Sequence, residues 1–294
     1  MITQPLLSSF RRYCRFAIPA LCIAALNTPV FAQQGADGDA SPSVASKVPG
    51  IEIAKLSALP KAPASASSRR DCQTLTRLKS EGGKIADAQG WGVTGETRLG
   101  SYDVVSFAGK FEAGTSGSCD IDAGNVALFR GRQLVALVYA ASHSKQTISN
   151  IVTSPVNGGI RILDGDLVPM PVADLRLAGG NAIEVDPLPA EDPICDGRGA
   201  APNVYGQSVR QARKTLIAQG WTPVRSTASD PLAKELRASG IVEVSDCAGT
   251  GFAFCSYYYR KGNIELNLTS FGDGDAPTVS DYGAICDRSR WHHR

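Results

Sequence analysis

Histidine is scarce in this chain of 294 residues, which contains only His143, His292 and His293. The eight cysteines include no C-x-x-C pair, the spacing that is typical of structural zinc sites. Zinc binding is therefore disfavoured. An excess of charge is lacking too, because 30 basic and 28 acidic residues leave a formal net charge of +2. This near-zero net charge does not indicate binding to nucleic acid or another polyanion.

Long apolar runs are also lacking. The N-terminal apolar run, residues 16–26, is well below the ~20 residues that a helix needs to cross a bilayer. Three arginines precede this run, and V-F-A at residues 30–32 places small residues before a cleavage point. This order predicts a secretory signal peptide over residues 1–32. We expect a periplasmic or secreted protein with no transmembrane anchor after cleavage.

Cysteine remains well represented after that cleavage. Loss of Cys14 and Cys22 leaves six cysteines, and an even number in an exported chain implies disulfides. A tight reversal at G-T-G, residues 249–251, would bring the cysteines on either side of it to the spacing that a disulfide prefers. The preferred pairs are Cys72–Cys119, Cys247–Cys255 and Cys195–Cys286. Spacing alone leaves other pairings open.

The first half of the chain changes composition near residue 69. Residues 33–68 are rich in Ala, Ser, Pro and Gly, which predicts a flexible leader, with an edge strand at residues 51–56 as an alternative. Residues 69–187 contain short runs of Val, Ile, Leu and aromatics separated by Gly, Asn and Asp, which predicts a mainly antiparallel β domain. Residues 130–132, R-G-R, predict a hairpin. The expected strands are residues 103–108, 125–129, 133–139, 160–163, 175–177 and 182–185.

Three prolines between residues 187 and 193 mark a domain boundary, which we place at residues 187–196. Residues 195–287 then predict a small α+β domain braced by disulfides, and residues 288–294 a tail. The expected fold class is therefore α+β, with a mainly antiparallel β domain first. The expected strands of the second domain are residues 241–244, 252–260 and 264–269.

Two helices are predicted in the second domain by their end signals. Ser208 is a suitable N-cap, and Gly220 suits the left-handed residue that ends a helix and lets Trp221 pack back on it. A second helix is expected to begin after Asp230 and to end at Gly240. The sequence A-Q-G-W occurs at residues 88–91 and again at 218–221, which suggests a duplicated helix, Gly-Trp, strand element.

Catalytic motifs are incomplete. Ser142 and Lys145 fit the spacing S-x-x-K of penicillin-recognising enzymes, but the partner motifs S-D-N and K-T-G are absent, as is G-x-S-x-G. Residues 120–125, D-I-D-A-G-N, resemble the start of a calcium loop, yet Gly124 and Gly131 stand where ligand oxygens are required. We assign no catalytic residue, metal or cofactor from the sequence.

A run of three tyrosines is the strongest candidate for a ligand surface. Tyrosine offers a large contact area at little cost in rotamer entropy, so the Y-Y-Y-R run could hold a sugar or a peptide. Alternation along a strand places the first and third tyrosines on one face and the second on the other. The predicted ligand-binding residues are Tyr257, Tyr259 and Arg260.

The pattern P-N-V-x-G-x-S-x3-A-x3-L-x3-G at residues 202–220 resembles the first half of a PASTA module, over residues 201–224. That resemblance implies a β-α-β-β fold and recognition of cell-wall muropeptides or β-lactams. The chain departs from the family where a second helix and a disulfide hairpin replace a short turn. The mature chain is also similar to exported proteins of Gram-negative bacteria that carry G-W and C-x-G-T-G-x3-C, here residues 220–221 and 247–255.

These features together predict an exported, non-enzymatic binding or envelope-associated protein, with peptidoglycan or an envelope protein as partner and no nucleic acid. A periplasmic hydrolase, with a site assembled by the fold, is an alternative. A proteinaceous inhibitor of a foreign hydrolase is another, with residues 249–251 as its tip.

Overall fold

The computed structural model describes residues 41–70, 72, 77–114, 118–165, 168–227, 229–249, 251–272 and 277–287. The predicted signal peptide and the tail at residues 288–294 lie outside the described residues. Residues 40–294 form one compact unit. A domain boundary at residues 187–196 therefore stays a prediction.

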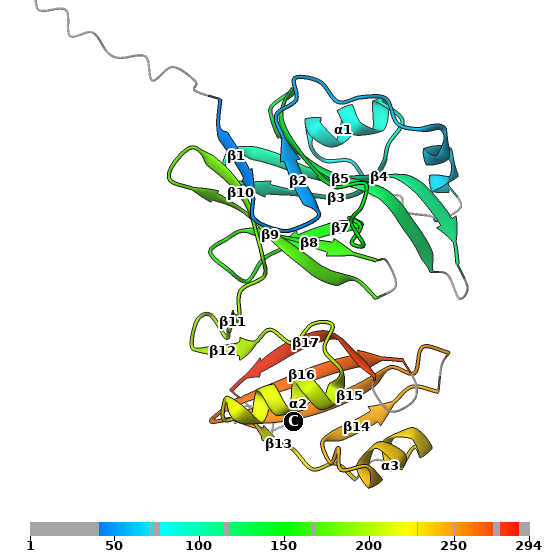
Figure 1. Cartoon of the computed structure of the whole chain (residues 1–294), viewed down its shortest axis with the longest axis vertical. Coiled ribbons are helices and arrows are strands. Elements are labelled where there is room, and N and C mark those ends of the chain that lie inside the picture. The colour runs from blue at the N-terminus through cyan, green and yellow to red at the C-terminus, as the bar shows by residue number, and fades with distance from the viewer. Residues whose placement is uncertain are drawn as a thin grey trace, which may run out of the picture. The chain divides into compact units, whose positions relative to one another are not determined.

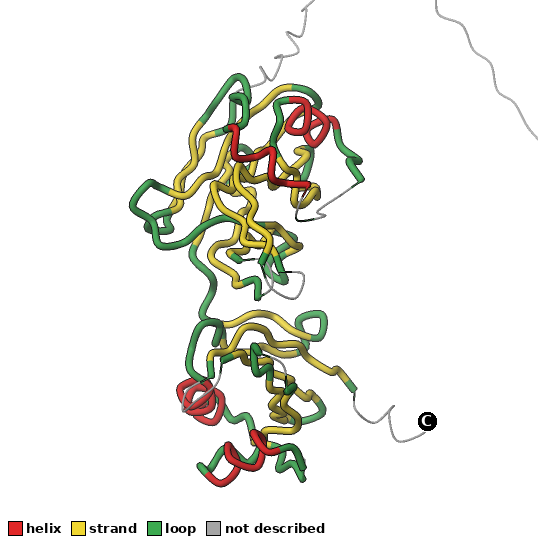
Figure 2. The backbone as a smooth tube through the Cα atoms, turned by 90° about the vertical axis from the view of Figure 1, so that its right-hand side faces the viewer, coloured by secondary structure: helices red, strands yellow, loops and turns green. Residues whose placement is uncertain are grey.

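Antiparallel strands dominate the fold, and helices are few (Figure 2). The first sheet has the order β1 (Ser43–Ser46), β10 (Ala182–Asp186), β9 (Met170–Ala178), β8 (Ile160–Asp164) and β7 (Asn150–Thr153). The second has the order β2 (Ile51–Ala54), β6 (Gln133–Ala140), β5 (Cys119–Arg130), β4 (Tyr102–Ala113) and β3 (Gly92–Leu99). All these pairs are antiparallel except β1 with β10 (Figure 1).

The first two sheets share one core. Strand alternation points Ile160 and Ile162 of β8 and Ile183 of β10 into the same buried cluster as Val104 of β4 and Val126 of β5. Strands β1 and β2 are neighbours at one margin of the two sheets, and β3 and β7 at the other. A sandwich of two sheets therefore encloses the cluster.

The opposite face of the second sheet is also covered. Helix α1 (Glu81–Ala88) and the 3₁₀ helix η1 (Ala64–Arg70) contact β4. Phe107, Phe129 and Trp91 are buried in the cluster on this side. The second sheet is therefore buried on both faces, as the continuous apolar stretch of β6 predicts.

The predicted strands of the β domain are all present, with β3, β7 and the outer parts of β4, β5 and β9 in addition. The hairpin at residues 130–132 joins β5 to β6, with Gly131 at a φ of 59°. The flexible leader is a wrong prediction for the described part of residues 33–68, because β1, β2 and η1 lie there. β1 extends the first sheet beside β10 and β2 extends the second beside β6, so each satisfies an otherwise open strand edge.

The C-terminal part contains a short hairpin and a third sheet. Strands β11 (Glu191–Ile194) and β12 (Gly199–Pro202) form the hairpin. The third sheet has the order β13 (Thr222–Pro223), β15 (Cys255–Lys261), β16 (Ile264–Phe271) and β17 (Thr278–Cys286), and β14 (Val244–Cys247) also pairs with β15. Helix α2 (Val209–Ala218) packs on this sheet through Val209, Ala212 and Leu216, which share its core.

The predicted helix ends are confirmed. The hydroxyl of Ser208 accepts the N–H of Gln211 at 3.3 Å, and the carboxylate of Asp230 accepts the N–H of Ala233 at 2.7 Å at the start of α3 (Pro231–Ala238). Gly220 has a φ of 85°, and the N–H of the next residue, a tryptophan, donates to Leu216 O at 3.0 Å.

The A-Q-G-W repeat has the same structure in both places. Gly90 has a φ of 91°, and the N–H of Trp91 donates to Ala86 O at 3.1 Å, as at the end of α2. Each copy leads into the first strand of an antiparallel series, β3 in one case and β13 in the other. A shared helix end is also what A-Q-G-W favours by itself, so duplication stays a hypothesis.

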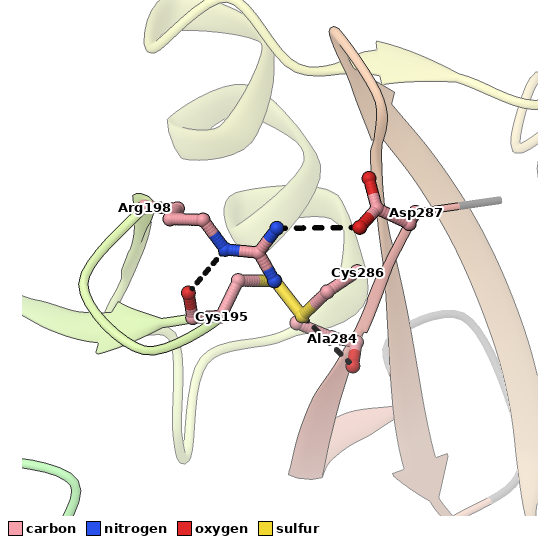
Figure 3. The surroundings of a disulfide bond; sticks show 5 residues. All are labelled: Cys195, Arg198, Ala284, Cys286 and Asp287. Atoms are coloured by element: carbon pink, nitrogen blue, oxygen red, sulfur yellow. Dashed lines mark hydrogen bonds and ion pairs between the residues drawn. A yellow bond between two sulfur atoms is a disulfide. The ribbon is translucent and has the colours of Figure 1, made fainter. Parts of the chain in front are cut away.

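All three predicted cysteine pairs lie at disulfide distance. The Cα–Cα distances are 5.5 Å for Cys72–Cys119, 5.6 Å for Cys195–Cys286 and 4.1 Å for Cys247–Cys255. Beside Cys195–Cys286, Arg198 Nε donates to Cys195 O at 3.0 Å and Nη1 lies 3.3 Å from Asp287 Oδ2 (Figure 3). Among the described residues, no helix combines the length and the apolar character needed to span a membrane.

Candidate functional site

The predicted tyrosine site is wrong. Tyr257 and Tyr259 have no exposed surface, because they lie on the sheet face that α2 covers. The Tyr259 hydroxyl donates to Glu243 Oε1 at 2.6 Å, and burial raises the pKa of Tyr257 to about 12. Arg260 is exposed and pairs with Glu265 at 3.4 Å. Both rings are core residues that no ligand in solution can reach.

The middle tyrosine of the run faces the other way. Tyr258 lines an open pocket of about 490 Å³ together with Arg225, Ser245 and Glu265. Cross-strand pairing places Tyr258 opposite Asn267, on the face of the third sheet away from Tyr257. The tyrosine run therefore does contribute one residue to a surface pocket, on the other face from that predicted.

The incomplete catalytic and calcium motifs do not adopt their expected geometry. Residues 141–145 form a loop, so Ser142 and Lys145 are not one helical turn apart. Ser144 Oγ accepts the N–H of Gln146 at 3.0 Å, which closes the loop rather than forming a nucleophile and base pair. Residues 120–125 belong to strand β5, not to a calcium loop. Among the described residues, no three His, Cys, Asp or Glu side chains are placed to hold a metal ion.

The fold nevertheless brings both motifs to one cavity, which we call the Trp91 pocket. It has a volume of about 660 Å³, within the usual range for small-molecule sites. Its residues come from β2, from the Gly-Trp turn after α1, from β5 and β6, and from the loop at residues 141–148. Its lining includes six aromatic, polar or large apolar side chains that a ligand could contact: Trp91, Asp122, Asn125, Leu137, Tyr139 and Gln146.

The aromatic members are held firmly. Trp91 Nε1 donates to Pro60 O at 2.8 Å, and the ring centroid lies 4.9 Å from that of Phe107. The Tyr139 hydroxyl donates to Glu52 Oε2 at 2.7 Å, and this bond raises the pKa of Tyr139. Both rings are therefore fixed before a ligand arrives, which lowers the entropic cost of binding.

A strained backbone positions the polar members. Ala123 has a φ of 52° in the middle of β5, a conformation that costs a residue other than glycine about 1–3 kcal/mol. Asp122 Oδ1 accepts the N–H of Ala123 at 2.7 Å, and Asn125 Nδ2 donates to Ala123 O at 3.0 Å. Asp122 and Asn125 thus stabilise the strained residue while lining the pocket.

Gly124 lets the loop close over the strand. A Cβ atom at this position would lie 1.5 Å from Ile148 O, so no other residue fits there without movement of the loop. That loop is anchored at its ends by the bonds Ala141 N–H to Gly50 O at 2.9 Å and Ser149 N–H to Leu163 O at 2.8 Å. Loop and strand are therefore held in one arrangement.

Replacement of Gly124 by alanine is expected to lower the free energy of unfolding by about 1–3 kcal/mol, because the new methyl group overlaps a main-chain carbonyl. Urea denaturation measures the loss. Gly283→Ala is the matched control, since a Cβ there meets nothing within 4 Å and β17 already has extended backbone. Equal stability of the two variants would show that the loop does not close on β5 as described.

Comparison with known proteins finds no matching family, no similar curated protein and no similar solved structure. The PASTA resemblance thus stays a prediction. Sequence reasoning singled out Trp91, Asp122 and Ser142 for three unrelated reasons and missed Tyr139, Asn125 and Gln146 as site residues. Period-two alternation does place Leu137 and Tyr139 on one face of β6, but it does not indicate which face stays open.

Proposed function

We propose that the chain is an exported, non-enzymatic binding protein and that the Trp91 pocket binds a cell-wall glycan. Sugar rings present flat C–H faces, which pack on aromatic rings, and hydroxyl groups, which bond to carboxylates and amides. One cavity offers both kinds of partner: the ring of Tyr139 with the small part of Trp91 that stays exposed, 8%, and the planar polar groups of Asp122, Asn125 and Gln146. This combination is the observation that carries the proposal.

The charges at the pocket favour a neutral ligand. Among the described residues that line it, Asp122 is the single carboxylate, and none is a lysine or arginine. An anionic ligand would therefore lack a counter-charge. Hydrolysis of a glycosidic bond needs a pair of carboxylates, one on each side of the bond. One carboxylate favours binding over the alternative of a periplasmic hydrolase.

Export is supported by the cysteines. Three pairs at disulfide distance are expected in an oxidising compartment, such as the bacterial periplasm or the outside of the cell. A protein in the periplasm meets peptidoglycan directly. Disulfides also keep a binding surface in one arrangement in a compartment where reduction is not expected.

The test is sedimentation of the mature protein with purified peptidoglycan, followed by calorimetric titration with N-acetylglucosamine oligosaccharides. We expect the unmodified protein to sediment with the wall material. Tyr139→Ala and Gln146→Ala are each expected to weaken binding about tenfold, or about 1.4 kcal/mol, because each removes a direct contact from the pocket.

Tyr258→Ala is the matched control, because it removes a half-buried tyrosine from the separate pocket on the third sheet. Binding should be unchanged in this variant. Failure of the unmodified protein to sediment with peptidoglycan would overturn the glycan proposal. Loss of binding in Tyr258→Ala alone would move the site to the third sheet.

A further inference from the structure

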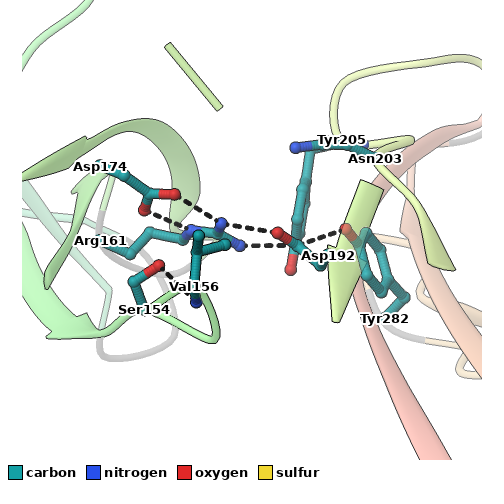
Figure 4. Close-up of polar contacts among 8 residues, drawn as sticks. All are labelled: Ser154, Val156, Arg161, Asp174, Asp192, Asn203, Tyr205 and Tyr282. Atoms are coloured by element: carbon teal, nitrogen blue, oxygen red, sulfur yellow. Dashed lines mark hydrogen bonds and ion pairs between the residues drawn. The ribbon is translucent and has the colours of Figure 1, made fainter. Parts of the chain in front are cut away.

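A third cavity lies beside a buried arginine that links the first sheet to the C-terminal part. The guanidinium of Arg161, on β8, makes two bonds of 2.9 Å to Asp174 and two of 2.8 Å to Asp192 (Figure 4). The Tyr282 hydroxyl donates to Asp192 Oδ2 at 2.6 Å, and its ring packs on Tyr205 with centroids 4.5 Å apart. Two carboxylates thus share one cation.

The cavity beside this group, which we call the Tyr205 cleft, has a volume of about 380 Å³. Val152, Leu163 and Pro171 form an apolar part, and Val152 is 43% exposed. Tyr205, Phe254 and Asp281 line it from the C-terminal part. The cleft therefore combines apolar surface, two aromatic rings and a carboxylate.

The formal charges of the residues at and beside the Tyr205 cleft sum to a negative value. Arg161 and Asp281 line the cleft, and Asp174 and Asp192 pair with Arg161 behind it, so one cation and three carboxylates leave two formal negative charges. The pKa of Tyr205 responds accordingly: burial raises it first, and the charges of Asp281 and Asp192 raise it further, against the opposing effect of Arg161.

Asp281 is the carboxylate available to a ligand. It is exposed at the cleft, and none of the ion pairs formed among the described residues includes it. Partial burial by its neighbours nevertheless raises the pKa of its carboxyl, against the hydrogen bond from the Tyr282 N–H. A cation beside the Asp281 carboxylate would stabilise its charged form and so compensate for the contacts with water that the carboxylate loses on burial.

We propose that the Tyr205 cleft binds an alkyl chain that ends in a cation, as in the lysine or arginine side chains of a peptide. The cationic head lies against Asp281, within reach of the rings of Tyr205 and Phe254, which attract cations through their faces. The alkyl part lies against Val152 and its apolar neighbours. This site is separate from the Trp91 pocket and does not depend on the proposed glycan.

The test is an NMR titration of the mature protein with N-acetyl-lysine amide and N-acetyl-arginine amide, with N-acetyl-norleucine amide as the uncharged probe. We expect the cationic probes to shift resonances of the cleft residues with a Kd of about 1 mM. The norleucine probe should bind at least tenfold more weakly. Salt should weaken binding of the cationic probes, since one of the partners is exposed to solvent.

Asp281→Asn is expected to weaken binding of the cationic probes at least tenfold without lowering Tm. The raised pKa means that the charged carboxyl is less favoured in the folded chain than in the unfolded one, so it reduces stability above that pKa. The neutral amide removes this cost at pH 7. Asp246→Asn, which changes an exposed aspartate on β14, is the matched control and should leave binding unchanged.

Each outcome decides the proposal. Equal binding of the norleucine and lysine probes, or unchanged binding in Asp281→Asn, would overturn it, as would the absence of any shift at the cleft. Retained binding of cationic probes in Tyr139→Ala, whose change lies in the Trp91 pocket, separates this site from the proposed glycan site. The tighter of the lysine and arginine probes identifies the preferred side chain.

Discussion

Replacement of Arg161 by methionine should lower the free energy of unfolding by about 3–5 kcal/mol. The side chains of Arg161, Asp174 and Asp192 are 4%, 8% and 3% exposed, so removal of the cation leaves two buried carboxylates without a counter-charge. Methionine retains the length and apolar stem of the side chain, and the loss therefore reports on charge rather than on a cavity. Urea denaturation at pH 7 measures it.

The first sheet offers a matched control for this prediction. Arg176, on β9, also pairs with two carboxylates, Glu184 and Asp186, but its side chain is 37% exposed. Water compensates exposed charges, so Arg176→Met is expected to cost at most about 1 kcal/mol. Similar losses of unfolding free energy in both variants would show that burial does not determine how much the Arg161 group contributes to stability.

The Arg161 group also shows what a sequence leaves undetermined. Asp192 lies 31 residues after Arg161, in the proline-rich segment that predicts a linker, and Tyr282 comes 90 residues after Asp192. No periodicity or spacing rule connects these positions. Their meeting depends on how β11 and β17 lie against β8, which is a property of the assembled fold.

Local signals, in contrast, predicted local structure well. The ends of α2 and α3 depend on Ser208, Gly220, Asp230 and a following glycine, each of which acts within one turn of its helix. The hairpin at residues 130–132 and the Cys247–Cys255 pair are equally local. Strand β1 was missed and β2 was expected only as an alternative, because S-V-A-S and I-E-I-A become strands only where β10 and β6 offer open edges.

The candidate sites show the same contrast between local features, which the sequence predicts, and contacts that depend on the assembled fold. Alternation correctly places Tyr257 and Tyr259 on one face of β15, but the side that is buried depends on where α2 packs. The Trp91 pocket draws residues from four separate segments, so its members appear unrelated in the sequence. The D-I-D-A-G-N run does have a special structure, because its polar residues hold Ala123 at a positive φ. It does not form the calcium loop that its spacing resembles.

Joint replacement of Cys195 and Cys286 by alanine is expected to lower the free energy of unfolding by roughly 4–5 kcal/mol. A disulfide stabilises mainly by restricting the unfolded chain, and its effect grows with the length of the loop that it closes. This pair is 91 residues apart in the chain. The Cys247–Cys255 pair, at a separation of 8, should contribute only roughly 2–3 kcal/mol.

The position of Cys286 in the fold also predicts a local effect at the end of β17, in addition to the loss of overall stability. It is the last residue of β17, an edge strand that pairs with β16 along one side, and its partner Ile264 is the first residue of β16. Without the disulfide, no cross-link ties this end of the sheet to the β11–β12 hairpin. Amide hydrogens of residues 283–286 should then exchange faster in the Cys195 and Cys286 variant than in the Cys247 and Cys255 variant. Equal exchange at β17 in the two variants, or a larger loss of stability from the shorter loop, would contradict this account of how the C-terminal sheet is held.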